Sequence, residues 1–162
     1  MKRRQTVPEQ WMILNGRLDA TALAAIRSLP RGSGLLVLCR LAPADHRRLR
    51  RVASLRAIRI IQEAPRTAAR VHNLRELSRA RLRGAGLILI SPVYRTRSHP
   101  DWQPLGRMRA ATLARLAGGD AIALGGMDEQ RFEPTRRLGF VGWAGISSWL
   151  KVTKSRRAAP KV

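Results

Sequence analysis

The stretch Gly86-Leu87-Ile88-Leu89-Ile90 is a continuous apolar run that follows a basic, helix-forming segment and precedes a polar loop. A short run of this kind is typical of a parallel strand that is buried on both faces. Similar runs recur along the chain, and longer amphipathic stretches separate them. The alternation predicts βα units and a parallel sheet.

Seven apolar runs are expected to form the strands, with helices between them. The strands are expected at residues 11–14, 35–39, 58–61, 68–71, 86–90, 121–124 and 139–143. Asp19, Asn73 and Asp128 precede helical stretches as N-caps, and Pro43 opens another helix. Seven strands are one fewer than a closed (βα)8 barrel contains, and 162 residues are fewer than its typical ~250. We therefore predict an α/β fold, a parallel TIM-type (βα) barrel that lacks one βα unit, with a doubly wound open sheet as the alternative.

Composition excludes several classes of protein. Hydrophobic residues make up 44% of the chain, which suffices for a buried core and argues against disorder. No run of roughly 20 uncharged apolar residues could span a membrane, and no apolar segment follows the basic N-terminus as in a signal peptide. The single cysteine, Cys39, excludes internal disulfides. We expect a soluble cytoplasmic protein with a basic N-terminal extension (1–10), one barrel domain (11–150) and a flexible basic tail (151–162).

The charge of the chain is strongly basic. There are 32 lysine and arginine residues against 10 acidic residues, which gives a formal net charge of +22. Nearly all of the basic residues are arginines, whose planar guanidinium suits phosphate, so nucleic acid and small phosphorylated molecules are both candidate partners. Dense clusters occur only at 47–51 and in the tail, and the remaining arginines are spread out as on a solvated surface. We expect nucleic-acid binding to be weak and non-specific at most.

A phosphate site is predicted where the last two strands end, because barrels commonly bind phosphate there. Gly125 and Gly126 follow the penultimate strand, and Ser147 follows the last strand at the start of a short helix. In the loop after strand 86–90, the hydroxyls of Thr96 and Ser98 can both donate to one phosphate. The alternative interpretation of that loop is an ordinary polar surface segment.

The order of these motifs resembles the thiamine phosphate synthase and TenI family. Residues 91–100 read Ser-Pro-Val-Tyr-x-Thr-x-Ser-His-Pro, close to the family pattern Gly-Pro-Val-Phe-x-Thr-x-Thr-Lys. A Pro-Leu-Gly at 104–106 and Leu-Gly-Gly-Met at 124–127 follow in the family order. His72, in Val-His-Asn, resembles the histidine of the family's Ser-x-His-Thr segment. The resemblance extends over residues 69–149.

The resemblance implies a (βα)8 barrel that joins hydroxymethylpyrimidine diphosphate to thiazole phosphate and releases pyrophosphate with Mg²⁺. It implies that a set of hydroxyl, glycine and imidazole groups binds the phosphorylated substrate, namely Thr96, Ser98, Gly125, Gly126, Ser147 and His72. His99 stands where the family has a lysine that holds the departing pyrophosphate, and a histidine carries that charge only when protonated. Arg40 and His99 are therefore the expected catalytic residues.

The diphosphate half of the family site departs from the pattern. Only Arg40 remains of the family's Gln-x-Arg-x-Lys, and Arg70 stands where a substrate-binding serine is expected. Residues 62–69 leave no room for a βα unit, so the missing unit is expected there. Glu63 is the one expected Mg²⁺ ligand, and a single carboxylate is few even for an ion that keeps many waters.

Three functions therefore stay open from the sequence. The first is a thiamine phosphate synthase-like transferase with reduced or lost activity. The others are a TenI-like protein that binds a phosphorylated ligand without synthase activity and an arginine-rich nucleic-acid-binding protein. Low aromatic content, 4% of residues, disfavours the last of these, because single-stranded nucleic acids are commonly bound by stacking on aromatic rings.

Overall fold

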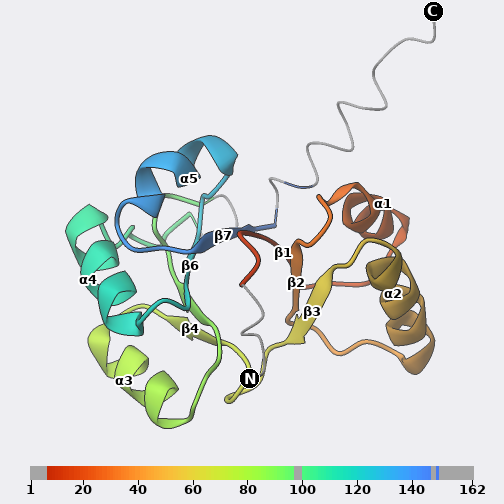
Figure 1. The fold of residues 1–162 in the computed structure, drawn as a ribbon, viewed down its shortest axis with the longest axis horizontal. Helices are drawn as coiled ribbons and strands as arrows, with labels where there is room; N and C mark the ends of the chain where they lie inside the picture. The colour runs from red at the N-terminus through yellow and green to blue at the C-terminus, as the bar shows by residue number, and fades with distance from the viewer. Residues whose placement is uncertain (1–6, 97–99, 147–148, 150–162) are drawn as a thin grey trace, which may run out of the picture.

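The computed structural model describes residues 7–96, 100–146 and 149. Seven strands and five helices follow one another along this part of the chain (Figure 1). In chain order they are β1 (Gln10–Leu14), α1 (Ala20–Ser28), β2 (Gly34–Val37), α2 (Pro43–Leu55), β3 (Arg59–Gln62), β4 (Ala69–Val71), α3 (Leu74–Leu82), β5 (Ile88–Ile90), α4 (Arg107–Ala117), β6 (Ala121–Leu124), α5 (Glu129–Arg136) and β7 (Gly142–Gly145).

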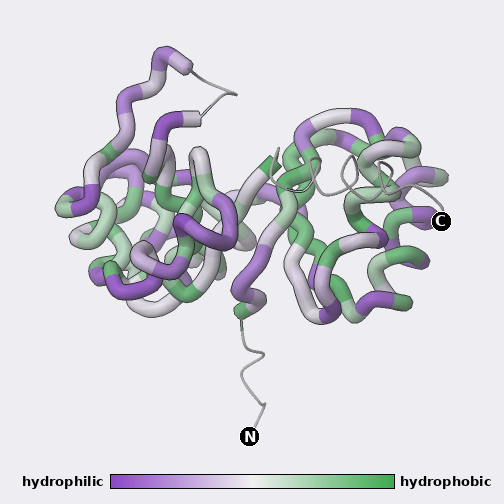
Figure 2. The backbone as a smooth tube through the Cα atoms, turned by 90° about the horizontal axis from the view of Figure 1, so that it is seen from above, coloured by the Kyte–Doolittle hydropathy of each residue, from purple (hydrophilic) through white to green (hydrophobic). Residues whose placement is uncertain are grey.

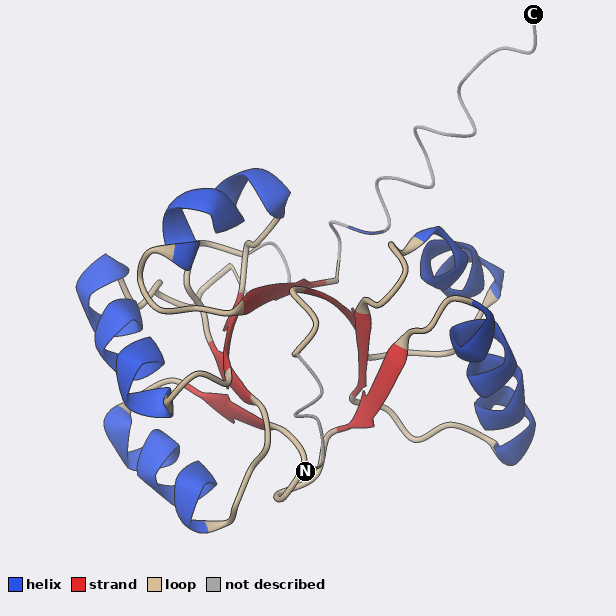
Figure 3. Cartoon of the chain, viewed as in Figure 1, coloured by secondary structure: helices blue, strands red, loops and turns tan. Residues whose placement is uncertain are grey.

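All seven strands form one parallel sheet in the order β3-β2-β1-β7-β6-β5-β4. The first strand pairs with both β2 and β7, as in a barrel whose last strand returns to the first. Figure 3 shows the sheet curled into an arch with the helices on its outer side and an opening between β3 and β4. The predicted fold class is confirmed, and the strand order excludes the doubly wound alternative.

The helices begin where the sequence predicts them. Side chains of Asp19, Asn73 and Asp128 each accept a hydrogen bond from the backbone N–H three residues later, at 2.7–2.9 Å. Pro43 lies in the first turn of α2, where its missing N–H costs no helical hydrogen bond. Figure 2 shows hydrophilic and hydrophobic segments alternating along the helices, as expected for helices with one face on a core.

Two cores lie on the two faces of the sheet. The larger one fills the space between the strands and the helices, and the smaller one fills the concave face. The smaller core contains Trp11, Ile13, Leu36, Ala68, Leu87, Leu89, Ile122 and Ala144. Trp11 is fully buried and lies so close to Gly34 that a side chain on Gly34 would overlap its ring. The glycine at the start of β2 therefore makes room for the tryptophan that fills the concave face.

The opening between β3 and β4 is where the sequence predicted the missing βα unit. The connection between these strands is a short turn, in which Ala64 and Ala68 form an antiparallel bridge and Thr67 donates its hydroxyl to the carbonyl of Gln62. In the described chain no helix lies between β3 and β4, and the side chains of β3 are half-buried or exposed. A hollow of about 590 Å³ runs along this strand.

Most strand bounds differ from the sequence prediction by one or two residues, and the last strand begins three residues later than expected. The last strand, expected at 139–143, lies at Gly142–Gly145, because Gly139 adopts a φ of +101° in the turn that ends α5. Just before β1, the backbone carbonyl of Glu9 also accepts a hydrogen bond from the Trp143 backbone N–H at 2.7 Å. The short helix expected at 146–150 and the tail from 151 lie mostly outside the described residues.

Candidate functional site

A cavity of about 300 Å³ opens at the carboxyl ends of the strands, and we call it the mouth cavity. Residues from six of the seven strand ends line it, together with Arg70 of β4 and three residues of the loop after β5. The lining residues are Ile13, Asn15, Leu38, Glu63, Arg70, Ser91, Pro92, Thr96, Trp102, Leu124, Gly125 and Ile146. The cavity lies at the end of the barrel where β/α barrels bind their ligands.

The loop after β5 is held against the loop after β6 by backbone hydrogen bonds. The N–H of Val93 donates to Leu124 O at 2.9 Å, and the N–H of Tyr94 donates to Gly125 O at 3.0 Å. Gly125 has a φ of +93°, and a Cβ there would lie 2.8 Å from Cα and Cβ of Pro92. This close approach holds the loop segment that carries Thr96 beside the cavity.

Gly126 serves the same contact. Its φ is +63°, and a side chain on it would overlap the backbone carbonyl of Arg95. Its own carbonyl accepts a hydrogen bond from Arg131 of α5. The two glycines thus allow the loops after β5 and β6 to pack against each other. The sequence analysis placed both glycines at a phosphate site and did not predict this packing role.

Glu63 and Arg70 form a two-pronged ion pair across the opening of the barrel. Arg70 Nε lies 2.8 Å from Glu63 Oε1, and Nη2 lies 3.3 Å from Oε2. The carboxylate comes from the end of β3 and the guanidinium from β4, which are the two unpaired edges of the sheet. Both side chains line the mouth cavity, so the pair joins the two edges beside the candidate site.

His72 lies behind the cavity in a chain of three side chains. Its Nδ1 is 2.8 Å from Glu76 Oε2, and its Nε2 is 3.3 Å from Ser91 Oγ, which lines the cavity. The rings of Trp102 and His72 are nearly perpendicular, with a centroid distance of 5.3 Å. Strand β4 and the start of α3 position the histidine, because Asn73, the next residue, caps that helix.

The carboxyl of Glu76 is held in its charged form. Burial alone would raise its pKa, but hydrogen bonds from the His72 backbone N–H at 2.7 Å, from the His72 ring and from Asn73 together lower it. Because a carboxylate only accepts hydrogen bonds, His72 Nδ1 carries the proton in this contact. In the neutral histidine, Nε2 then accepts the proton of the Ser91 hydroxyl.

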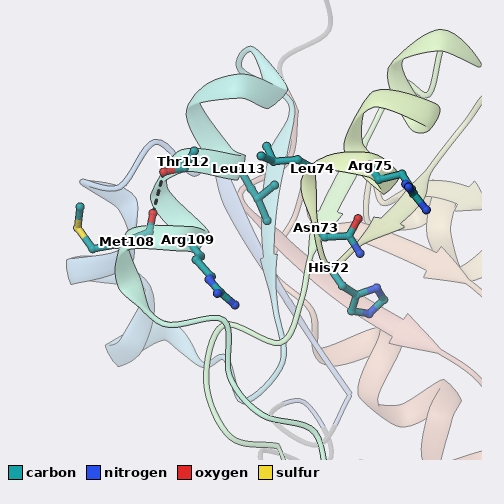
Figure 4. Close-up of a pocket in the computed structure, with 8 residues that line it drawn as sticks. All are labelled: His72, Asn73, Leu74, Arg75, Met108, Arg109, Thr112 and Leu113. Carbon is teal, nitrogen blue, oxygen red and sulfur yellow. Dashed lines mark hydrogen bonds between the residues drawn. The ribbon is translucent and has the colours of Figure 1, made fainter.

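A second hollow, of about 610 Å³, lies between the first turns of α3 and α4 on the other side of His72. Figure 4 shows that Arg109 extends from α4 on the side where His72 lies, whereas Met108 points away from the histidine. Arg75 of α3 also lines this hollow. His72 therefore stands between the mouth cavity and a basic hollow on the outer surface.

The structure brings together only part of the predicted site. Thr96, Gly125 and Glu63 line the mouth cavity, and His72 reaches it through Ser91. Arg40 is exposed in the loop after β2 and is not among the residues that line the cavity. The predicted residues Ser98, His99 and Ser147 lie outside the described residues.

Four residues that line the cavity were not predicted as site residues from the sequence, namely Asn15, Arg70, Ser91 and Trp102. Ser91 directly follows the apolar run of β5 and Asn15 directly follows that of β1, so their place after a strand end was an available signal. Arg70 stood out only where a substrate-binding serine was expected, and Trp102 was not among the predicted site residues. Their direction toward the cavity depends on the fold rather than on local sequence.

The donor set does not fit a resident Mg²⁺ ion. Glu63, the expected ligand, has both carboxylate oxygens bonded to Arg70. Within the part of the chain that the structure describes, no three His, Cys, Asp or Glu side chains are grouped as metal ligands. The cavity instead presents a guanidinium and hydroxyl groups, which favour an anion.

A parallel barrel with its cavity at the carboxyl ends of the strands belongs to the class of ligand-binding β/α barrels. The family model described as thiamine monophosphate synthase matches residues 49–149, and the chain belongs to this family. A segment of 80 residues is 32% identical to the protein named "Putative thiamine-phosphate synthase 2" of Aquifex aeolicus. That segment is 49% of this chain and spans 43% of the relative's length.

Two solved structures show the same fold at low identity. Thiamine phosphate pyrophosphorylase from Pyrococcus furiosus superposes with a TM-score of 0.68 at 13% identity, over 93% of this chain and 97% of its own. A structure described as native KDPGal superposes with a TM-score of 0.52 at 13% identity, over 98% of each chain. Among the described helices, none is both long and apolar enough to cross a bilayer.

Proposed function

We propose that this chain is a thiamine phosphate synthase-like transferase with slow turnover, and that its mouth cavity binds thiazole phosphate. The observation that carries the proposal is the meeting of Thr96, Arg70 and Ser91 at one cavity of about 300 Å³ at the strand ends. A phosphate group suits these donors, because a guanidinium and two hydroxyls can bond several of its oxygens at once. Family membership supports the thiazole phosphate as the source of that group.

The second substrate, a pyrimidine diphosphate, would find fewer partners in the described part of the site. The guanidinium of Arg70 is shared with Glu63, and Arg40 is not part of the cavity lining. Each missing positioned charge costs ~3–4 kcal/mol of transition-state stabilisation, or 10²–10³ in rate. Losing two such groups predicts turnover far below that of a family member that keeps them. Any Mg²⁺ would have to be held chiefly by the diphosphate rather than by a cluster of protein carboxylates.

The binding half of the proposal is tested by calorimetric titration of thiazole phosphate into the purified protein. A hydrogen bond to a charged group contributes ~1.5–3 kcal/mol, so Thr96→Ala should weaken binding by about tenfold or more. The double variant Thr96→Ala/Ser98→Ala should weaken it further. Thr112→Ala is the matched control, because Thr112 is an exposed threonine on α4 whose hydroxyl bonds Met108 O at 3.0 Å, away from the cavity.

The catalytic half is tested by measuring thiamine phosphate formation from both substrates, with the Pyrococcus furiosus enzyme assayed beside it. We expect turnover at least a hundredfold below that of the Pyrococcus furiosus enzyme. Turnover at the same rate would contradict the slow-enzyme part of the proposal. Unchanged affinity for thiazole phosphate in the double variant would contradict the assignment of the cavity.

A further inference from the structure

We infer that an anion in the mouth cavity is bound together with a proton, which His72 takes up through Ser91. The inference rests on the proposed function only in requiring that a phosphate group binds in this cavity. It assigns a role to the chain Glu76–His72–Ser91, which runs from α3 through the end of β4 to the end of β5.

The hydrogen bonds around His72 run in one direction when the ring is neutral. The Glu76 carboxylate accepts from His72 Nδ1 at 2.8 Å, so Nε2 of a neutral ring has only a lone pair. The Ser91 hydroxyl, 3.3 Å away, therefore donates its single proton to Nε2. In this arrangement Ser91 presents lone pairs rather than a proton to the cavity, which is unfavourable for an anion.

The direction reverses when a phosphate enters. For Ser91 to donate to the phosphate, its proton must turn toward the cavity, and Ser91 Oγ must then accept from Nε2. A ring that donates from both nitrogens is an imidazolium, so the reversal needs one proton from solvent. No bond other than this N–H forms, and the positive charge stays within the histidine ring.

The surroundings of His72 favour that charge from one side and oppose it from others. Glu76 carries the carboxylate that faces Nδ1, and its lowered pKa keeps it charged. Arg75 and Arg109 line the outer hollow that His72 also lines, and Arg70 lines the mouth with Ser91. Three guanidinium groups thus line the two hollows beside the ring, and an incoming dianion offsets the repulsion that they would exert on an imidazolium.

The coupling would let the cavity gain one positive charge where its described residues offer no cluster of metal-binding side chains. It also sets the sign of the pH dependence. Because a proton binds with the ligand, affinity falls as the pH rises, by up to tenfold per pH unit. A cavity held only by arginine and neutral hydroxyls would show no such slope for a ligand of constant charge.

The experiment is calorimetric titration of thiazole phosphate at pH 8 in two buffers of different ionisation enthalpy. At this pH the phosphate ester is fully dianionic, since its second pKa is near ~6, so any proton taken up enters the protein. For the unaltered chain we expect an uptake that approaches about one proton per ligand. Ser91→Ala should abolish the uptake, and Glu76→Gln should reduce it while keeping the helix start hydrogen-bonded. His46→Asn, on α2, is the control that should retain it.

The outcomes separate the two proposals. If thiazole phosphate does not bind the unaltered protein, the proposed function fails and this inference fails with it. If the ligand binds without proton uptake, or the uptake persists in Ser91→Ala and His72→Asn, only the inference fails. Uptake that is lost in His99→Asn but kept in folded His72→Asn would also overturn it, because the proton would then enter a different imidazole. Thermal unfolding of each variant establishes that it is folded.

Discussion

Replacing Gly125 by alanine should destabilise the barrel and loosen the candidate site together. The residue has a φ of +93°, a conformation that costs an alanine ~1–2 kcal/mol. The new Cβ would lie 2.8 Å from two carbon atoms of Pro92, and overpacking of this kind costs ~1–3 kcal/mol. The sum is ~3 kcal/mol, which lowers the Tm of a domain of this size by about 6–12 °C.

The matched control is Gly118→Ala. Gly118 has a φ of +76° at the end of α4, but no atom lies within 4 Å of a Cβ placed there. Only the conformational cost applies, so we expect a fall in Tm of about 2–8 °C. Thermal unfolding followed by circular dichroism measures both variants. Titration with thiazole phosphate should show weaker binding only in Gly125→Ala, since only that change moves the loop of Thr96. Equal losses of stability with unchanged affinity in both variants would refute the role assigned to the loop contact.

Three further predictions follow from the charges. Glu63→Gln should cost at most about 1 kcal/mol of stability, because the ion pair of Glu63 with Arg70 is partly exposed. The same change should tighten anion binding, because it frees the Arg70 guanidinium, and weaker binding in a calorimetric titration would contradict this. Hydrogen bonds lower the folded-state pKa of Glu76, so its contribution to stability is present above the unfolded-state pKa and is lost as the pH falls. The Tm difference between the unaltered chain and Glu76→Gln should persist at pH 5 and above and shrink below about pH 4. Binding to RNA or DNA should ignore sequence and collapse with added salt, as counterion release requires, and tight binding of one sequence at physiological salt would oppose this.

Local sequence signals predicted most of the fold because they act over a few residues. The N-caps Asp19, Asn73 and Asp128 begin helices as expected, and the short connection at 62–69 correctly located the missing unit. The last strand was misplaced because residues 139–141 continue the apolar run, while the conformation of Gly139 keeps them in a turn.

The site was harder to predict because it depends on where loop side chains point. Thr96 and Gly125 were found through their position after strands, and the structure places both at the cavity. Arg40 follows a strand in the same way, yet it is exposed and outside the cavity lining. The pairing of Ser91 with His72 joins residues from two strands, so it becomes visible only once the sheet register is known.

The central position of β7 has a consequence for how the chain folds. This strand comes last among the seven, yet it pairs with β1 on one side and β6 on the other. Before β7 is synthesised, the chain can form only two separate three-stranded halves, β1–β3 and β4–β6, because β3 and β4 do not pair. Joining the halves requires contacts across more than a hundred residues, such as Gln10 with Trp143, which makes the closing step slow in topological terms. During synthesis, the cavity at the mouth of the barrel therefore cannot form until β7 has joined the sheet.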